Sequence, residues 1–151
     1  MPKKVSEYMT RKVITIEPQA GLREAFFLMR DEAIRHLPVT SADGALIGII
    51  SDRELRRPGW VDESPEIGHE YQLTDDLHVS DVMITDVISV HTYETLTKAV
   101  GILLEHNVGA LPVLDKNGDL VGMLSAVDLL RAFKHSLDAQ KYDKKKRAVA
   151  S

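Results

Sequence analysis

The sequence contains one stretch of about 53 residues twice, and this repeat constrains the fold more than any other feature of the chain. With Val5 placed over Val79, residues 5–57 align with residues 79–131 without a gap, and about 16 of the aligned positions are identical. The matches include VSEYM with VSDVM, VITI with VISV, LPV with LPV, and DGALIGIIS with NGDLVGMLS. A duplication of this length predicts two copies that fold alike.

Each copy is predicted to begin with a short helical turn and a strand. The turns are expected at Ser6–Met9 and at Ser80–Met83. The runs Val13–Ile16 and Val87–Val90 are rich in β-branched residues, which favours strands.

A helix and a hairpin are predicted next. Apolar residues recur at helical spacing between Leu22 and Ala33, and again between Leu96 and Leu104. The expected hairpin strands are Leu37–Thr40 with Leu46–Ser51, and Leu111–Leu114 with Leu120–Ser125. They enclose Asp43-Gly44 and Asn117-Gly118, residue pairs that favour the positive φ values of a tight turn. With a final helix after Ser51 or Ser125, each copy has the order β-α-β-β-α.

The chain divides into four predicted parts: a first repeat at 1–57, a linker at 58–78, a second repeat at 79–135, and a helix end with a basic tail at 136–151. One repeat is too small to bury a comfortable core, so the two copies are expected to pack on one another. In the linker, Trp60 and Tyr71 are expected to pack on the body of the protein. The run Lys144–Arg147 is either a solvated tail or a basic surface that binds a partner.

Composition excludes several classes of function. The net charge of −4 implies no general attraction to nucleic acids or membranes. The absence of cysteine excludes disulfides and thiolate metal sites, and the six histidines show no metal-ligand spacing, so no metal site is predicted. The N-terminal residues have no apolar signal region, and no apolar run is long enough to span a membrane. We therefore expect a soluble, cytoplasmic protein.

The ordered motifs resemble those of the cystathionine β-synthase (CBS) domain. The first copy carries VxxxM, VITI, IRHLPV and DGALIGIISDREL, and the second carries VSDVM, VISV, VGALPV and NGDLVGMLSAVDLL. The resemblance implies an α/β fold in which two β-α-β-β-α CBS repeats pack with pseudo-twofold symmetry, an arrangement known as a Bateman module. It also implies an adenine nucleotide or adenosyl ligand in clefts between the copies, a homodimer formed through the helices, and regulation of an attached or partner protein rather than catalysis.

The family's ligand signature is a Gly-hydrophobic-x-Ser/Thr stretch followed three residues later by an acid. Gly122–Ser125 with Asp128 fits it fully, and Gly48–Ser51 with Glu54 fits it except for the longer acid. A carboxylate can accept hydrogen bonds from both ribose hydroxyls, and a hydroxyl beside free helix-start amides suits a phosphate. The same Ser-x-x-acid spacing also forms a capping box, so Ser51–Glu54 and Ser125–Asp128 have a purely structural interpretation as well.

The residues before each LPV differ between the copies. In the family, basic residues at this place contact phosphate, and small or apolar ones line the adenine from the opposite copy. The cleft with Glu54 is then expected to use Arg35 and His36 for phosphate, with Val108, Gly109 and Ala110 against the base. The cleft with Asp128 is expected to be lined by Thr10, Lys12, Val13, Ile14, Ile34 and Arg35, and Val87 completes the predicted ligand-binding set. A solvent-facing strand start is the alternative for Arg35 and His36.

Three classes of function remain to be compared. The first is a stand-alone regulatory module that binds AMP, or else ADP, ATP or S-adenosylmethionine, as a regulatory ligand and signals to an unknown effector protein; no cofactor is required. The second is a structural or protein-interaction module with vestigial, unliganded clefts. The third, an enzyme, is disfavoured because the sequence has no nucleophile–base pair, no P-loop and no cysteine. No catalytic residue is therefore predicted.

Overall fold

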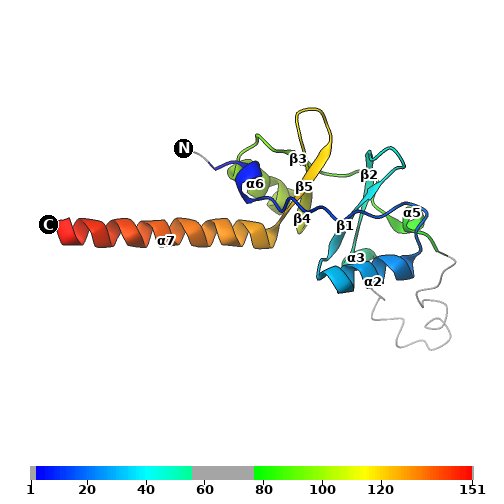
Figure 1. The fold of residues 1–151 in the computed structure, drawn as a ribbon, viewed down its shortest axis with the longest axis horizontal. Helices are drawn as coiled ribbons and strands as arrows, with labels where there is room; N and C mark the ends of the chain where they lie inside the picture. The colour runs from blue at the N-terminus through cyan, green and yellow to red at the C-terminus, as the bar shows by residue number, and fades with distance from the viewer. Residues whose placement is uncertain (1–2, 56–76, 151) are drawn as a thin grey trace. The chain divides into compact units, whose positions relative to one another are not determined.

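The computed structural model describes residues 3–55 and 77–150, and it separates into two compact units (Figure 1). Unit 1 consists of Met1–Val13 with Ile88–Ser151, and unit 2 consists of Ile14–Val87. The fold is mixed α/β, as predicted, and each unit has its own small sheet and its own helices. Trp60 and Tyr71, for which we predicted packing, lie outside the described residues.

In both units a helix, an antiparallel pair of strands and a second helix follow one another in that order. In unit 2 the elements are α2 (Leu22–Glu32), β1 (His36–Thr40), β2 (Leu46–Ser51), α3 (Asp52–Leu55) and α5 (Val79–Val82). In unit 1 they are α1 (Val5–Tyr8), β3 (Val90–His91), α6 (Leu96–His106), β4 (Ala110–Leu114), β5 (Leu120–Ser125) and α7 (Ala126–Ala150). The short helical turn comes last in unit 2 and first in unit 1, and among the described residues only unit 1 has a strand, β3, before its long helix. The predicted helices and hairpin strands are confirmed to within one or two residues at most ends.

The two hairpins have the same register. β1 pairs antiparallel with β2, β4 pairs antiparallel with β5, and each ladder has a bulge near the turn. Gly44 and Gly118 have φ values of +86° and +87°, whereas Asp43 and Asn117 do not have positive φ. Only the glycine of each predicted pair therefore adopts the left-handed conformation that the turn requires.

The strands predicted at Val13–Ile16 and Val87–Val90 are wrong in extent, and proline explains why. In unit 2 the first strand is reduced to one parallel bridge, in which Ile16 N donates to Pro38 O and Thr40 N donates to Ile16 O. The ladder cannot continue in either direction, because Pro18 and Pro38 have no N–H to donate. In unit 1, Thr92 stands where Pro18 stands and donates to Leu114 O, so a short strand, β3, forms.

The helical turns pack on the core of the opposite sequence repeat. Val5 of α1 and the C-cap residue Met9 lie in a core with Val90, Leu111 and Leu124, which all come from the second repeat. Val79 of α5 lies in a core whose other buried members, such as Leu37, come from the first repeat. The compact units therefore differ from the sequence repeats by an exchange of these opening segments.

Backbone pairing holds each exchanged segment in place. Thr10 and Met123 donate to each other's carbonyl oxygens, and Ile49 and Ile84 do the same in unit 2. Each exchanged segment can approach its strand closely because the strand residue that faces it, Gly122 in β5 or Gly48 in β2, has no side chain. A Cβ on Gly122 would lie 2.7 Å from Met9 Sδ and 3.0 Å from Thr10 O.

Helix α7 runs for 25 residues and includes the whole Lys144–Arg147 run, so the segment predicted as a helix end and tail is helical to Ala150. Figure 1 shows its far end extending beyond the strands and α6 of its own unit. Within residues 3–55 and 77–150, no helix combines the length and apolar character that crossing a membrane requires.

Replacing Gly122 with alanine is expected to destabilise unit 1 by about 1–3 kcal/mol, because the new methyl group meets Met9 and the Thr10 backbone. The matched control is Gly101→Ala in α6, where a Cβ has nothing within 4 Å and helix propensity favours alanine by about 0.5–1 kcal/mol. The urea midpoint of unfolding should fall for Gly122→Ala and rise for Gly101→Ala. A shift of the same sign in both would contradict the close approach.

Candidate functional site

The most buried charged group described is the carboxylate of Asp128, in the first turn of α7, with 4% of the residue exposed. Its Oδ2 accepts hydrogen bonds from Ser125 N at 2.9 Å and Ser125 Oγ at 3.1 Å. Its Oδ1 accepts from Thr10 Oγ1 and from Arg131 Nη1, both at 3.3 Å, and Thr10 Oγ1 also lies 3.5 Å from Oδ2. Four donors thus surround a group that has about four lone-pair positions.

The start of α7 is a complete capping box. Asp128 N donates to Ser125 Oγ at 3.3 Å while the Asp128 carboxylate receives the Ser125 N–H. One edge of the carboxylate, Oδ2, therefore serves the helix. The other edge, Oδ1, faces Thr10 from the N-terminal segment and the largely exposed Arg131.

Other predicted site residues gather around this helix start within unit 1. Ala126 N, the first amide of α7, donates to Gly109 O at 3.0 Å, which places the residues before β4 beside Ser125. Ala110 is buried, whereas Val108 and Gly109 are exposed. Lys12 and Val13 follow Thr10 in the chain, and the Lys12 side chain is exposed.

Unit 2 repeats the capping arrangement with a longer acid. Glu54 Oε2 accepts from Ser51 N at 2.6 Å and also from Ser51 Oγ. Ser51 Oγ in turn accepts from Arg53 N at 3.3 Å. The structural alternative considered for these pairs is therefore realised in both units, and capping does not distinguish Glu54 from Asp128.

Arg35 and His36 lie at the start of β1, next to the same helix start. Asp52 N donates to Arg35 O at 2.9 Å, the counterpart of the bond to Gly109 O. Burial lowers the pKa of the His36 imidazole below its ordinary value of 6.5, and the neighbouring Arg35 and Arg53 add to this effect. The carboxylates of Asp52 and Glu54 oppose it. His36 is consequently neutral near pH 7, so in the absence of ligand Arg35 is the permanent cation of the pair.

The two units differ where the exchanged segment meets the acid. Ile84 occupies in unit 2 the position that Thr10 occupies in unit 1, and both make the same backbone pairing. Ile84 has no hydroxyl, so unit 2 has no equivalent of the bond from Thr10 to Asp128. Lys12 is likewise matched by Asp86, which reverses the charge at that place.

The predicted ligand-binding residues divide between the two units. Unit 1 holds Thr10, Lys12, Val13, Val108, Gly109, Ala110, Ser125 and Asp128. Unit 2 holds Ile14, Ile34, Arg35, His36, Ser51, Glu54 and Val87. The predicted pairings of Ile34 and Arg35 with Asp128, and of residues 108–110 with Glu54, join different units and remain predictions.

Sequence reasoning missed Arg131 as a neighbour of the acid. Its guanidinium forms an ion pair with Asp128 although 63% of the Arg131 side chain is exposed. The available signal was the spacing of three residues on a helix, which places the two side chains on one face.

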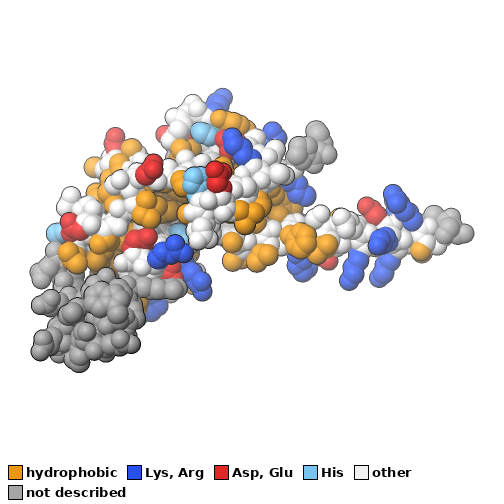
Figure 2. Space-filling view, turned by 180° about the vertical axis from the view of Figure 1, so that it is seen from behind, with side chains coloured by type: hydrophobic (Ala, Val, Ile, Leu, Met, Phe, Trp, Pro, Cys, Tyr) orange, Lys and Arg blue, Asp and Glu red, His pale blue; other side chains and the backbone are white. Residues whose placement is uncertain are grey.

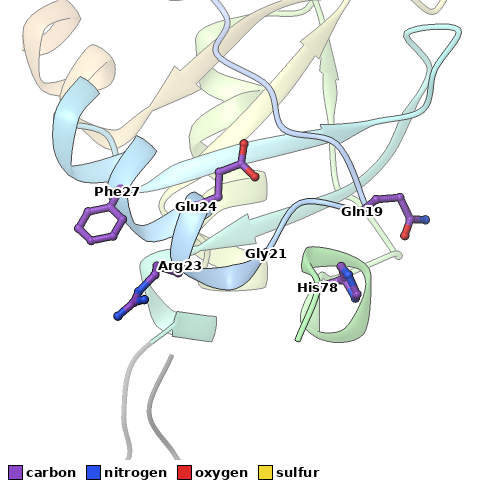
Figure 3. Close-up of a pocket in the computed structure, with 6 residues that line it drawn as sticks. All are labelled: Gln19, Gly21, Arg23, Glu24, Phe27 and His78. Carbon is purple, nitrogen blue, oxygen red and sulfur yellow. The ribbon is translucent and has the colours of Figure 1, made fainter. Parts of the chain in front are cut away.

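A pocket of about 400 Å³ in unit 2 is separate from these residues (Figure 3). It lies between the first turns of α2 and the residue before α5, and its lining residues are Gln19, Gly21, Arg23, Glu24, Phe27 and His78. None of them belongs to the predicted ligand-binding set. In the described part of the chain, no group of three or more His, Cys, Asp or Glu side chains could hold a metal ion.

Comparison with known proteins gives a family match over both repeats. The family model described as CBS domain matches residues 5–58 and again residues 79–135. A CBS domain-containing protein of Dictyostelium discoideum is 35% identical over 127 residues, which cover 83% of this chain and 88% of that protein. The chain spans only 24% and 23% of homoserine O-acetyltransferases from Methanocorpusculum labreanum and Methanococcoides burtonii, so the match covers a small part of those enzymes.

Solved structures of similar proteins share the fold. The protein AcuB from Vibrio cholerae is 30% identical with a TM-score of 0.73, covering 94% of this chain and 98% of that one. CBSX2 of Arabidopsis thaliana, solved in complex with AMP, is 25% identical with a TM-score of 0.70, covering 88% of this chain and 97% of that one. Two repeats with this element order are therefore a known architecture.

The lowered pKa of His36 predicts a pH dependence of stability. Since the unfolded chain binds the proton more readily than the folded one, the free energy of unfolding is expected to fall as pH drops below about 6.5. Urea titrations between about pH 7.5 and about pH 5.5 would measure this slope. His36→Gln should make the slope shallower, and an equal slope in both proteins would contradict the assignment.

Proposed function

We propose a function for this chain, which belongs to the CBS domain family. It is a regulatory module that binds an adenosine-containing ligand and signals to a partner protein. The observation that carries the proposal is the Asp128 carboxylate, buried at a helix start with one edge directed to Thr10 and Arg131. AMP is bound by a relative that is 25% identical over most of both chains.

The chemistry of unit 1 suits a ribose and a phosphate. Oδ1 of Asp128 is the edge not required by the helix cap, and a carboxylate is a strong acceptor for a vicinal diol. Arg131 supplies positive charge beside it, and Lys12 lies two residues after Thr10 in the chain, although no basic pair precedes β4. AMP is the first candidate ligand; ADP, ATP and S-adenosylmethionine share the adenosine part and follow it. As in the family, residues of both repeats are proposed to line the cleft.

Unit 2 offers the complementary set. Arg35 and His36 adjoin the Ser51–Glu54 helix start, and a phosphate close to His36 would favour its protonation. Its acid is the longer Glu54, and Ile84 replaces the threonine. We therefore propose two unequal sites, of which the one at Asp128 binds ribose better.

A structural or protein-interaction module with empty clefts is the second candidate. Two observations favour it: Ser51–Glu54 is fully explained as a capping box, and unit 2 has no hydroxyl at position 84. A melting screen with adenosine, AMP, ADP, ATP and S-adenosylmethionine separates the candidates, because a ligand that binds only the folded state raises the midpoint. Mass spectrometry of gently purified protein would identify a nucleotide that co-purifies.

Regulation rather than catalysis is part of the proposal. The enzymes among the relatives are several times longer than the stretch that this chain matches.

Asp128→Ala is expected to weaken AMP binding at least tenfold in isothermal titration calorimetry. The variant also loses a helix cap, which costs about 0.5–2 kcal/mol of stability. The matched control is Thr95→Ala, because Thr95 caps α6 of the same unit by accepting from Lys98 N at 3.2 Å. Thr95→Ala should lower the melting midpoint to a similar degree and leave AMP affinity unchanged. Equal losses of AMP affinity in both variants would show that Asp128 affects binding only through the stability of unit 1.

A homodimer is proposed as well, and a stripe on α7 supports it. Val127, Leu130, Phe133 and Leu137 recur at spacings of three and four residues and are 46–66% exposed. Figure 2 shows hydrophobic side chains along the first half of this helix and Lys and Arg side chains along the second half. A second copy is the proposed occupant, because a twofold axis brings identical stripes together.

Phe133→Glu is expected to shift the protein from dimer to monomer in sedimentation velocity, since it places a charge in the stripe. Tyr142→Glu is the control, because Tyr142 is 67% exposed on the same helix and lies off the stripe. It should leave the dimer intact. A wild-type protein that sediments as a monomer at high concentration would refute the dimer.

A further inference from the structure

The ion pair between Arg131 and Asp128 occupies the edge of the carboxylate that a ribose would need. Oδ2 is taken by the two Ser125 donors that hold the helix start, so a vicinal diol can approach only Oδ1 without breaking the cap. Oδ1 is held by Thr10 and Arg131 at 3.3 Å each. Binding a diol there therefore requires that one or both of these donors move away.

Arg131 is the donor that can move at low cost. Its side chain is 63% exposed, whereas the Asp128 side chain is 5% exposed, so the guanidinium covers the carboxylate from the solvent side. The backbone of Thr10 is fixed by two hydrogen bonds to Met123. A rotation of the Arg131 side chain then frees one of the two acceptor positions of Oδ1, while Thr10 keeps the other.

The displaced guanidinium has different partners with different ligands. A neutral nucleoside offers it no anion, so its charge returns to water. A 5′-nucleotide has a phosphate on the same ribose that displaced it, and a guanidinium binds phosphate through two parallel hydrogen bonds. The exchange of one anionic partner for another is favourable only with the phosphorylated ligand.

We propose that Arg131 is a specificity-determining residue of the Asp128 site, which selects 5′-phosphorylated adenosine ligands over unphosphorylated ones. In the free protein it covers the ribose-binding edge of Asp128, and in the complex it contacts the phosphate. This inference rests on the proposed function, and it gives unit 1 a phosphate-binding cation despite Gly109-Ala110 standing where unit 2 has Arg35-His36.

Calorimetry with AMP and adenosine on the full chain tests the proposal, with Arg131→Gln as the main variant. The ratio of adenosine Kd to AMP Kd is expected to fall at least tenfold, with AMP bound more weakly and adenosine bound equally well or more tightly. Arg131→Lys should retain part of the preference, because it keeps the charge but not the two-pronged geometry. Lys134→Ala is the matched control: Lys134 lies one turn further along α7 and pairs with Asp138 at 3.0 Å. It should leave both constants unchanged.

The outcomes separate this inference from the function on which it rests. If wild-type protein binds neither AMP nor adenosine, both proposals fail. If it binds them and Arg131→Gln weakens both to the same degree or leaves the ratio unchanged, the role of Arg131 is refuted and the regulatory module stands. Circular dichroism of each variant checks that the fold is retained.

Discussion

A buried carboxylate has to be surrounded by hydrogen-bond donors, and much of unit 1 is arranged to supply them to Asp128. The end of β5 supplies Ser125, α7 supplies Arg131, and the N-terminal segment supplies Thr10. These donors come from both ends of the chain. The carboxylate therefore joins the helix cap, the docking of α1 and the candidate ligand site in one set of hydrogen bonds.

The same constraint explains why the two units are unequal. Glu54 is long enough to reach back to Ser51, so its helix start is capped in the same way. The segment that meets it presents Ile84, which can pack but cannot donate. Divergence has thus preserved the backbone pairing at both places and changed the side chain that touches the acid. Two copies with similar core residues can in this way carry two sites of different chemistry.

Most of the local structure was predictable because its signals lie close together in the sequence. The helices α2 and α6 follow from apolar spacing, and the hairpins follow from their β-rich runs and glycine turns. The strand next to each LPV was overestimated, since its length depends on which residues of the neighbouring strand have an N–H to donate. Pro18 and Pro38 could have revealed this only once the parallel pairing was known.

The candidate site was predictable in its residue types and less so in its contacts. Ser125 and Asp128 were identified from a motif, and their capping geometry follows from the spacing. The ion pair with Arg131 and the neutral state of His36 depend on burial and on side-chain direction, which a sequence pattern does not specify. The packing of α1 on the second repeat was equally hidden, because the alignment of the copies is the same whichever core the turn joins.

That exchange of opening segments has a consequence for how such a chain could arise. A single copy of the repeat would lack Val5 and Met9, or their counterparts, in its own core, and would have to receive them from another molecule. Two separate copies could satisfy each other only by trading their first turns, as domain-swapped dimers do. Joining them in one polypeptide makes the trade intramolecular. Each half of the sequence therefore has a complete core only in the presence of the other half.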